Sequence, residues 1–518
     1  MIFPLKDKLF YLSWRLFAVL ICIAAIIVVL TYSIRYESSL CLGIPVKSED
    51  QLSDYKYTDI TDADALILFE GEPCAIDAQT STVYISQEIR PDTGMHDLSG
   101  KLTTANSEYE LFFKESSDFE SLASAVENGN SFTLVLADSQ MQAKKYNVIF
   151  TTLPVINLTG DFSYTNIVDR PVNFGRVCIW SPFDPQLGRP SVKTSALEWN
   201  VRGATSADYP KKPWKLSLKS DSAEQNRDLS LLGLGEDDDW ILNPMNTDDT
   251  DVREKLMMTV WNELAAETDH NYPMTVGEYV EVVINGTYNG LYHLQRRIDR
   301  KYLSLDRSSI IMKGSYNTTA EFPREAYEII YTPLSDEETF DTLSDIGMPV
   351  GQDIMNMDNY VDVSLLIQLG ALRDNKGFKN TYYVIDRTDD PRLSLVLWDT
   401  DLSFGINYIY SFTYDYNTMI NMICNRCESS YISQLYPDID TMMAERWFEL
   451  REELFTKEKL YGIIDENLEI LKLSGAENRD VALWGHAHGD RDTVESMKKF
   501  IEERFEFLDD YYGENLEN

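Results

Sequence analysis

Spaced carboxylates in the C-terminal half of the chain are the residues best suited to chemistry. Asp399 and Asp401 follow the strand-like run LSLVLW, whereas Asp374 follows a predicted helix and precedes Asn380. A strand that ends in spaced carboxylates, followed by a glycine, is a good place to hold a hard cation with oxygen ligands. Phosphoryl transfer uses such cations, together with a carboxylate that orients the attacking hydroxyl. The alternative is that both groups belong to turns whose charges are solvated.

Basic residues upstream of these carboxylates have two possible roles. Lys212 and Lys215 lie in or beside the predicted strand WKLSLK. A lysine on a strand can hold a fixed cation against a nucleotide's phosphates, but lysine is also common on solvated strand edges. Arg253 stands at the start of a predicted helix, where it can contact phosphates or form a salt bridge with the acidic loop before it. Both interpretations stay open for each residue.

The hairpin between the runs EYVEVVI and TYNGLYHL is the clearest local signal. Asn285-Gly286 separates the two runs, and Asn-Gly suits the positive φ angles of a two-residue turn. His293 follows in the second strand, and we expect it to pack rather than to act in catalysis.

The elements that must position these residues change character along the chain. Strand-like runs separated by Gly, Asp, Asn and Ser predict a small, sandwich-like β-domain over residues 63–160, after a polar spacer at 35–62. In residues 161–518 strands come early and helices late, which indicates an α+β domain with a β-rich N-lobe and a helical C-lobe. Apolar residues at helical spacing predict helices over residues 251–269, 359–372, 438–472 and 492–511.

Composition narrows the choice of partners. The 518-residue chain carries 85 acidic and 46 basic residues, a formal charge of −39. A nucleic acid is therefore excluded as a partner for the chain as a whole, because phosphate binding needs a basic surface. The charge fits a basic partner or a solvated acidic surface.

Residues 16–34 predict a transmembrane anchor. The segment has no charged residue and no proline, and it is just long enough to cross a hydrocarbon core of about 30 Å. Basic residues precede it and acidic residues follow, so residues 1–15 are expected in the cytoplasm and the bulk of the chain outside. A cleaved signal peptide is the alternative, but no A-x-A-like site follows the segment.

Two of the six cysteines, Cys424 and Cys427, form a C-N-R-C pair. A zinc site would need further ligands near them, and neither a second C-x-x-C nor an adjacent histidine exists. We expect a local disulfide or two free thiols.

Four separated segments, in order, resemble the CotH family of atypical, spore-coat-type protein kinases. The resemblance covers roughly residues 165–510. The segments are Arg202-Gly203 followed by Tyr209–Leu218, Leu231–Leu242 leading to Asp248 and Arg253, Tyr279–Tyr292, and Asp374 through Lys379-Asn380 to Trp398–Gly405.

The resemblance implies a bilobal kinase-like domain that binds ATP with Mg²⁺ or Mn²⁺ and phosphorylates Ser or Thr in proteins. Asp374 takes the role of the catalytic-loop aspartate, and Asn380, Asp399 and Asp401 those of metal ligands. The implied substrate is a basic, Ser-rich coat or envelope protein. The residues implied to hold the nucleotide are Arg202, Lys212, Lys215 and Arg253.

Two departures accompany the resemblance. The spacing from Asp374 to Asn380 is one residue longer than the D-x-x-x-x-N of a kinase catalytic loop. Many family members have G-x-Y-x-L-x-E after the hairpin, whereas this chain reads Leu291-Tyr-His-Leu-Gln-Arg-Arg297. The alternative functions are a non-enzymatic, membrane-anchored scaffold that binds protein and, less supported, a carbohydrate-active enzyme with paired carboxylates as acid and base.

Overall fold

The computed structural model describes most of the chain beyond the predicted anchor. The described residues are Val19, Ile23, 40–116, 119–164, 169–203, 205–314, 327–345, 355–386, 392–408, 411–412, 414–420 and 436–517. Apart from Val19 and Ile23, the segment 16–34 lies outside them, as do Cys424 and Cys427. Among the described residues, no helix combines the length and the apolar character needed to cross a membrane. Cys41, Cys74 and Cys178 are buried free thiols.

The N-terminal region is rich in β-structure, as expected, and begins earlier than the sequence indicated. Its main sheet is eight-stranded, and a smaller three-stranded sheet packs with it. Residues 40–57, expected to be a spacer, supply strands to the main sheet because Cys41, Leu42 and Ile44 are buried in its core. The main sheet contains β1 (Leu40–Cys41), β2 (Ile44–Lys47), β9 (Tyr109–Lys114), β10 (Phe132–Asp138), β11 (Gln142–Thr151), β7 (Thr82–Ser86), β6 (Ala75–Asp77) and β3 (Lys56–Tyr57).

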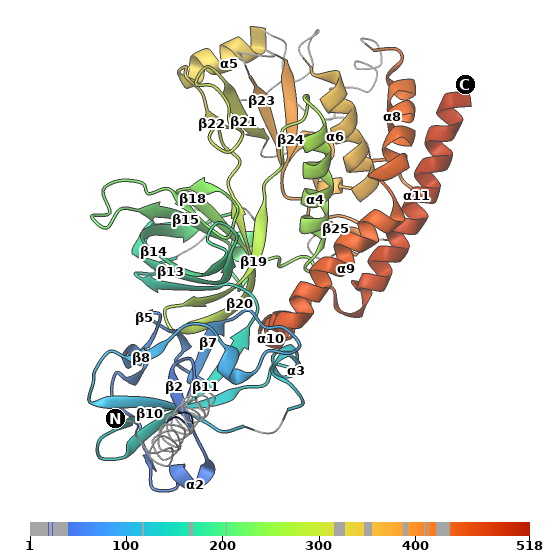
Figure 1. Cartoon of the computed structure of the whole chain (residues 1–518). Coiled ribbons are helices and arrows are strands. Elements are labelled where there is room, and N and C mark those ends of the chain that lie inside the picture. The colour runs from blue at the N-terminus through green and yellow to red at the C-terminus, as the bar shows by residue number, and fades with distance from the viewer. Residues whose placement is uncertain are drawn as a thin grey trace, which may run out of the picture.

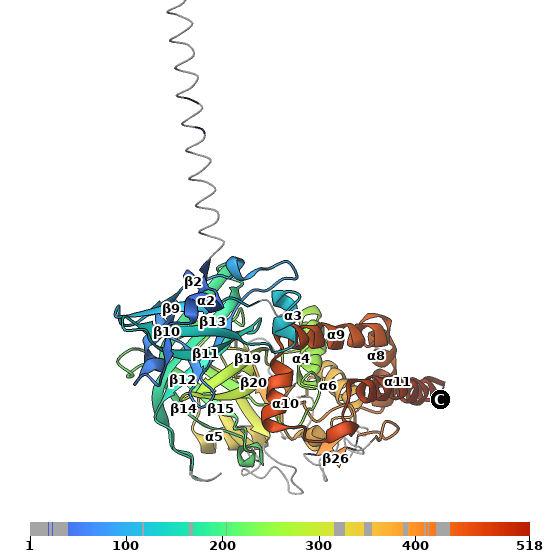
Figure 2. The same ribbon diagram turned by 90° about the horizontal axis from the view of Figure 1, so that it is seen from below.

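A smaller sheet and two short helices also belong to this region. The smaller sheet pairs β5 (Glu72–Pro73), β4 (Ile67–Phe69) and β8 (Leu102–Thr104). Two short helices, α2 (Glu49–Leu52) and α3 (Leu122–Glu127), lie outside the sheets, and α3 faces the C-terminal helices in both views (Figure 1, Figure 2).

The N-lobe of the following domain is a closed β-barrel (Figure 1). Its first strand pairs in parallel with β19, with Val155 opposite Glu281, and this pairing closes the ring. Asn285 and Gly286 have φ of 48° and 72° and form the expected two-residue turn between β19 and β20. The barrel strands in order are β12 (Val155–Gly160), β13 (Asn173–Asp184), β14 (Arg189–Val201), β15 (Trp214–Lys219), β18 (Asp239–Asn243), β20 (Thr287–Arg296) and β19 (Gly277–Ile284).

The C-lobe joins a small antiparallel sheet to a group of helices (Figure 1). The sheet order is β22 (Tyr327–Tyr331), β21 (Ile310–Gly314), β23 (Thr381–Ile385) and β24 (Leu393–Leu397). The long helices predicted from apolar spacing are all present, and residues 438–472 form two helices rather than one. The helices are α4 (Arg253–Glu267), α5 (Asp336–Asp345), α6 (Met357–Gly370), α8 (Ile439–Glu453), α9 (Lys457–Ser474), α10 (Ala476–Trp484) and α11 (Val494–Glu517).

Helix α10 connects the C-lobe to the barrel through buried polar contacts. It lies along β20, where the Arg479 guanidinium forms a two-pronged ion pair with the fully buried Glu281 carboxylate, with N–O distances of 2.9 and 2.7 Å. The Tyr288 hydroxyl donates to the same carboxylate at 2.5 Å. The Tyr288 ring stacks on Tyr84 of the N-terminal region at 4.3 Å. The three parts of the described chain therefore meet at one buried cluster.

Candidate functional site

A pocket of about 480 Å³ lies between the barrel and the C-lobe sheet. It brings together four of the residues singled out in the sequence: Arg202, Lys215, Asn380 and Asp399. Residues far apart in the chain line it from both lobes. The barrel side contributes Arg202, Gly203, Ser206, Lys215, Asp239, Trp240, Ile241 and Arg297, and the sheet side contributes Lys313, Gly314, Glu328, Ile330, Asn380, Tyr382, Trp398 and Asp399.

The Arg202-Gly203 pair begins the barrel side of the pocket because the chain turns sharply after β14. Gly203 has φ of 88°, a conformation that side chains disfavour. A Cβ atom at this position would lie 2.1 Å from the Ser206 hydroxyl oxygen. The glycine thus lets the following short helix, η3 (Thr205–Asp208), fold back against the turn. This turn places Arg202 at the pocket wall.

Asp399 and Asp401 occupy the loop that follows β24. Asp399 adopts φ of 62° directly after Trp398 and lines the pocket. Asp401 is not among the lining residues; its carboxylate accepts a hydrogen bond from the Thr247 hydroxyl. Burial, and then the neighbouring negative charge of Asp399, hold the pKa of Asp401 well above its usual range. The two aspartates are close neighbours, and a cation beside Asp399 would relieve their repulsion.

Asp374 and Asn380 meet despite their long spacing. Asp374 lies in a short 3₁₀ helix, η5 (Arg373–Phe378), and Asn380 adopts φ of 52° just before β23. The Asn380 side-chain amide donates to Asp374 at 2.7 Å, and the Lys379 ammonium pairs with the same carboxylate at 2.5 Å. The extra residue is accommodated by the helical turn and by the left-handed backbone of Asn380. Asp374 therefore lies one hydrogen bond away from a residue that lines the pocket.

The four basic residues named from the sequence divide into two groups. Lys215 lines the pocket but its ammonium pairs with Asp239 at 3.2 Å. Lys212 points elsewhere: its ammonium donates to the Ala207 carbonyl at 2.8 Å and lies 4.9 Å from the centre of the Tyr164 ring. We therefore correct the assignment of Lys212 to the nucleotide. The alternation of side chains along an extended segment explains why Lys212 and Lys215 face different ways.

Arg253 has a structural role instead of a place in the pocket. It is completely buried, and its guanidinium pairs with Asp248 and with Asp492 at 2.6 Å. It also donates to the Ser403 carbonyl at 3.0 Å. Arg253 thus joins the start of α4 to the loop that carries Asp399 and to the start of α11. Of the two roles open from the sequence, the structure supports the salt bridge.

Glu254 and Gln295 form a buried pair near Asp399 that the sequence did not single out. The Gln295 amide donates to the Glu254 carboxyl at 2.6 Å, and the Asn243 amide donates to it at 2.7 Å. Burial, followed by the negative charge of Asp399, raises the pKa of Glu254 to about 8. Arg296, next in the chain, occupies the position where G-x-Y-x-L-x-E has its glutamate, and its guanidinium pairs with Asp237 at 2.5 Å.

Lys313 is the second residue that sequence reasoning missed. It lies on β21, and its ammonium is 5.3 Å from the centre of the Trp398 ring and 5.6 Å from that of Tyr382. Burial and the positive charge of Arg202 lower the pKa of Lys313 to about 8. The lone lysine in the strand-like run SIIMKG was the available signal. His293, expected to pack, is buried, and burial lowers its pKa to about 3, so that it is neutral.

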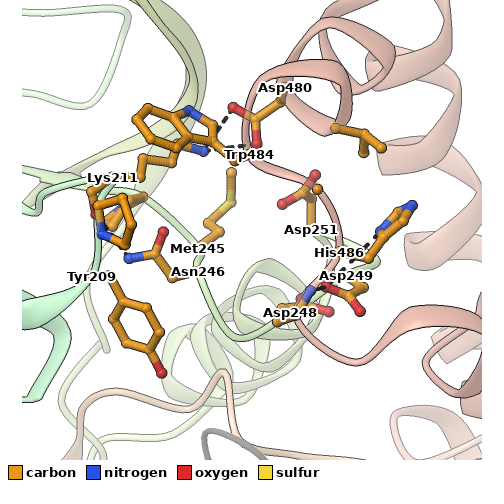
Figure 3. A pocket seen from close by; sticks show the side chains of 15 residues that line it. Tyr209, Lys211, Met245, Asn246, Asp248, Asp249, Asp251, Asp480, Trp484 and His486 are labelled. Carbon is orange, nitrogen blue, oxygen red and sulfur yellow. Dashed lines mark hydrogen bonds and ion pairs between the residues drawn. The ribbon is translucent and has the colours of Figure 1, made fainter.

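A second, smaller pocket of about 160 Å³ lies between the barrel, the loop before α4 and α10 (Figure 3). Its wall is acidic, but most of its carboxylates already have partners. Asp480 pairs with the buried Lys211 ammonium at 2.8 Å, and Asp249 accepts the backbone N–H groups of Ala487 and His488 at 2.5 and 2.6 Å. These bonds hold the C-terminal segment against the barrel. We assign this pocket a structural role.

The larger pocket has the donors that a metal-bound polyphosphate requires. Asn380 and Asp399 supply side-chain oxygens of the type that Mg²⁺ and Mn²⁺ prefer. The positive charges of Arg202, Lys215, Arg297 and Lys313 are suited to phosphate oxygens. The buried rings of Tyr382 and Trp398 pack against the Lys313 ammonium, and the Trp398 ring also packs against the Arg202 guanidinium. The residues present therefore fit a nucleotide with its metal ion.

Comparison with known proteins found a family that the chain matches. The family model described as CotH kinase protein matches residues 200–347 and 350–508, more than half of the chain. The matched ranges include every residue that lines the larger pocket except Arg170. A search of curated proteins found no match.

Proposed function

Because the chain belongs to the CotH kinase protein family, we propose that it transfers the γ-phosphate of ATP to Ser or Thr hydroxyls of a protein, with Mg²⁺ or Mn²⁺. The observation that carries the proposal is the pocket between the lobes, where basic side chains from the barrel face Asn380 and Asp399 from the sheet side. Both halves of a phosphoryl-transfer site, phosphate-binding cations and metal-binding oxygens, therefore border one cavity.

Asp374 is proposed to act on the attacking hydroxyl. Its carboxylate is held by Lys379 and by Asn380, so that its orientation is fixed before a substrate arrives. A carboxylate in this place can accept the hydroxyl proton as the oxygen attacks phosphorus.

Asn380 and Asp399 would hold the metal ion, with Asp401 behind them. When bound, the metal neutralises charge on the phosphates. The Thr247 hydroxyl and the Arg253 network hold the loop on which Asp399 and Asp401 lie. The site thereby keeps its acidic loop in one arrangement instead of reorganising it during the reaction.

A basic, Ser-rich coat or envelope protein is the substrate that the net charge favours. A formal charge of −39 attracts polycations at long range. Peptides of equal Ser content but opposite charge test this part: we expect a Lys/Arg-rich peptide to be phosphorylated faster than an acidic one at low salt. Equal rates would contradict the charge argument and leave the kinase assignment intact. Membrane anchoring through residues 16–34, with the bulk of the chain extracytoplasmic, stays a prediction.

The test of the kinase activity is transfer of labelled γ-phosphate by the full-length chain to itself and to a basic Ser-rich peptide, with divalent metal present. We expect Asp374→Asn and Asp399→Asn each to lose activity by about 100-fold or more. Asp465→Asn, an exposed aspartate on α9 that pairs with Lys498, is the matched control and should keep full activity.

Two outcomes would contradict the kinase. Undiminished transfer in Asp399→Asn would mean that this carboxylate does not hold the metal. No transfer together with no calorimetric binding of ATP would favour the alternative, a catalytically inactive scaffold that binds protein with the same fold.

A further inference from the structure

Among the described residues, two cations of the pocket between the lobes, Arg202 and Lys313, form no ion pair. Lys215 and Arg297 also line the pocket, but both pair with Asp239, at 3.2 and 3.1 Å. Within the described part of the chain, neither the Arg202 guanidinium nor the Lys313 ammonium forms an ion pair or a hydrogen bond, and each lies against an aromatic ring. Positive groups in a half-buried pocket are costly to leave without a counter-charge.

The two unpaired cations converge on one ring. The Arg202 guanidinium lies 5.5 Å and the Lys313 ammonium 5.3 Å from the centre of Trp398. A ring face attracts a cation but carries no net charge, so the ring does not cancel their mutual repulsion, and the negative charges of Asp399 and Glu328 offset it only in part. Asp399 follows Trp398 in the chain, yet its carboxylate forms no ion pair with either cation among the described residues. An anion that reaches both cations would remove this repulsion.

The two cations also belong to different lobes. Arg202 follows β14 of the barrel, whereas Lys313 lies on β21 of the C-lobe sheet. The strand lysine expected to hold phosphates, Lys215, is on the barrel and already has a partner. An anion with several charged groups can bind Arg202 and Lys313 together, and in doing so it connects the lobes across the pocket.

We propose that Arg202 and Lys313 form a clamp that binds one polyphosphate chain beside the Trp398 wall of the pocket. Because the two cations belong to different lobes, binding connects the barrel to the C-lobe sheet. The inference deepens the proposed kinase function and rests on it for the identity of the natural ligand, a nucleoside triphosphate. The clamp itself recognises linked phosphates and makes no use of the base.

Isothermal titration of the full-length chain with inorganic tripolyphosphate, ATP and adenosine tests the clamp. We expect Arg202→Met and Lys313→Met each to weaken binding of tripolyphosphate and ATP by about tenfold or more, with adenosine binding unchanged. Lys313→Arg keeps the charge and should retain most of the affinity. Lys457→Met removes an exposed lysine of α9 that pairs with Glu502, and it should bind all three compounds as the unaltered chain does.

Whether the bound phosphates connect the two lobes is tested separately, by comparing the affinities of the single and double variants. If both cations hold one chain of phosphates, removal of either prevents closure, and the second residue then contributes less. The double variant Arg202→Met, Lys313→Met should therefore lose much less affinity than the product of the two single losses. Tripolyphosphate should also raise the melting temperature of the unaltered chain and raise it less in either single variant. Independent, multiplicative losses would overturn the inter-lobe part of the proposal.

Different results would refute the clamp and the proposed kinase activity. Unchanged tripolyphosphate affinity in Lys313→Met, or phosphate transfer by that variant with an unchanged KM for ATP, refutes the clamp and leaves the kinase intact. Binding of tripolyphosphate that depends on both residues, with no phosphate transfer to any peptide, refutes the kinase and leaves the clamp. A loss of adenosine binding equal to the loss of ATP binding would show that the substitution damaged the pocket as a whole, and that result also refutes the clamp.

Discussion

At the level of single residues, Glu254 is one of the carboxyls that burial keeps protonated near neutral pH. Glu254 accepts hydrogen bonds from Gln295 and Asn243, yet its pKa is raised to about 8 because it is buried beside Asp399. In the unfolded chain the same carboxyl ionises near pH 4.5. The folded protein therefore holds a proton between these two values that the unfolded chain releases.

This difference in proton binding sets the sign of a pH effect. Raising the pH from about 5 to 8 should lower the free energy of unfolding, because only the unfolded state gains by releasing the proton. Glu254→Gln keeps the shape and removes the titration, so it should be more stable than the unaltered chain at pH 8 by on the order of 3 kcal/mol. Urea unfolding across this pH range, with a chelator present, measures the difference.

The control for this experiment lies on the same helix. Glu263→Gln changes a carboxylate of α4 that is partly exposed and pairs with Lys459, and it should leave the pH profile of stability unchanged. Parallel profiles for Glu254→Gln and the unaltered chain would contradict the raised pKa.

A site residue could be predicted from the sequence where its position depends on neighbouring residues in the chain, and not where it depends on distant ones. Asp399 follows a strand and Asn380 precedes one, so that secondary structure alone brings them to the same side of the C-lobe sheet. Lys313 has no such local signal, because its place in the site depends on Trp398 and Arg202, which are distant from it in the sequence. Arg253 shows the opposite case: its helix start was predicted, but its partner Asp492 is 239 positions away.

At the level of elements, α10 is the piece that most directly holds the lobes together. The nine-residue helix was not predicted, although Gly475 and Gly485, both with positive φ, bracket it. In its sequence, AENRDVALW, four of the five apolar residues are consecutive, so no helical spacing stands out. Its contacts are polar: Arg479 binds Glu281, and Asp480 accepts the backbone N–H of Leu291 at 2.8 Å.

Arg479→Met should be strongly destabilising, because it leaves the Glu281 carboxylate buried without its ion-pair partner. We expect the free energy of unfolding to fall by about 3–5 kcal/mol, measured by urea unfolding. Lys472→Met breaks an exposed pair with Glu127 and should cost no more than about 1 kcal/mol. Adding Glu281→Met to Arg479→Met should restore much of the loss. Equal costs for the two single variants would mean that the buried pair is not what holds α10.

At the level of the whole molecule, the N-terminal region and the barrel share one core. Val155, Cys178, Trp180, Val283 and Tyr288 of the barrel pack in the same cluster as the N-terminal sheet. The Ala78 N–H donates to the Gly286 carbonyl at the barrel's hairpin, at 2.9 Å. The region is therefore a structural part of the enzyme-like domain and not an independent module on a linker.

A chain truncated to residues 154–518 should show the consequence of this shared core. It would expose the barrel face that Tyr84 and its neighbours cover, and large exposed apolar patches promote association. We expect a lower melting temperature than that of the full-length chain, and a larger apparent mass by size-exclusion chromatography with light scattering. A monomeric fragment with an unchanged melting temperature would show that the barrel does not need the N-terminal region.

The sequence predicted which kind of secondary structure each region contains better than it predicted how the regions pack against one another. Alternating apolar residues indicated the strands of the N-terminal region and Asn285-Gly286 indicated the hairpin, because both signals are local. Closure of the barrel was not predictable in the same way: the pattern of β12 shows which of its faces is apolar, but not that its edge pairs with β19. The shared core went unpredicted for the same reason.

The closed barrel also sets an order of events while the protein is being made. Chain leaves the ribosome from its N-terminus, so the strand containing Val155 emerges long before Glu281, its partner in the closing pair. Until then one edge of the growing sheet is open, and open edges readily join to other strands. Protection of that edge, by a chaperone or by the already folded N-terminal sheet beside it, is then a requirement of biosynthesis that ends once the barrel is closed.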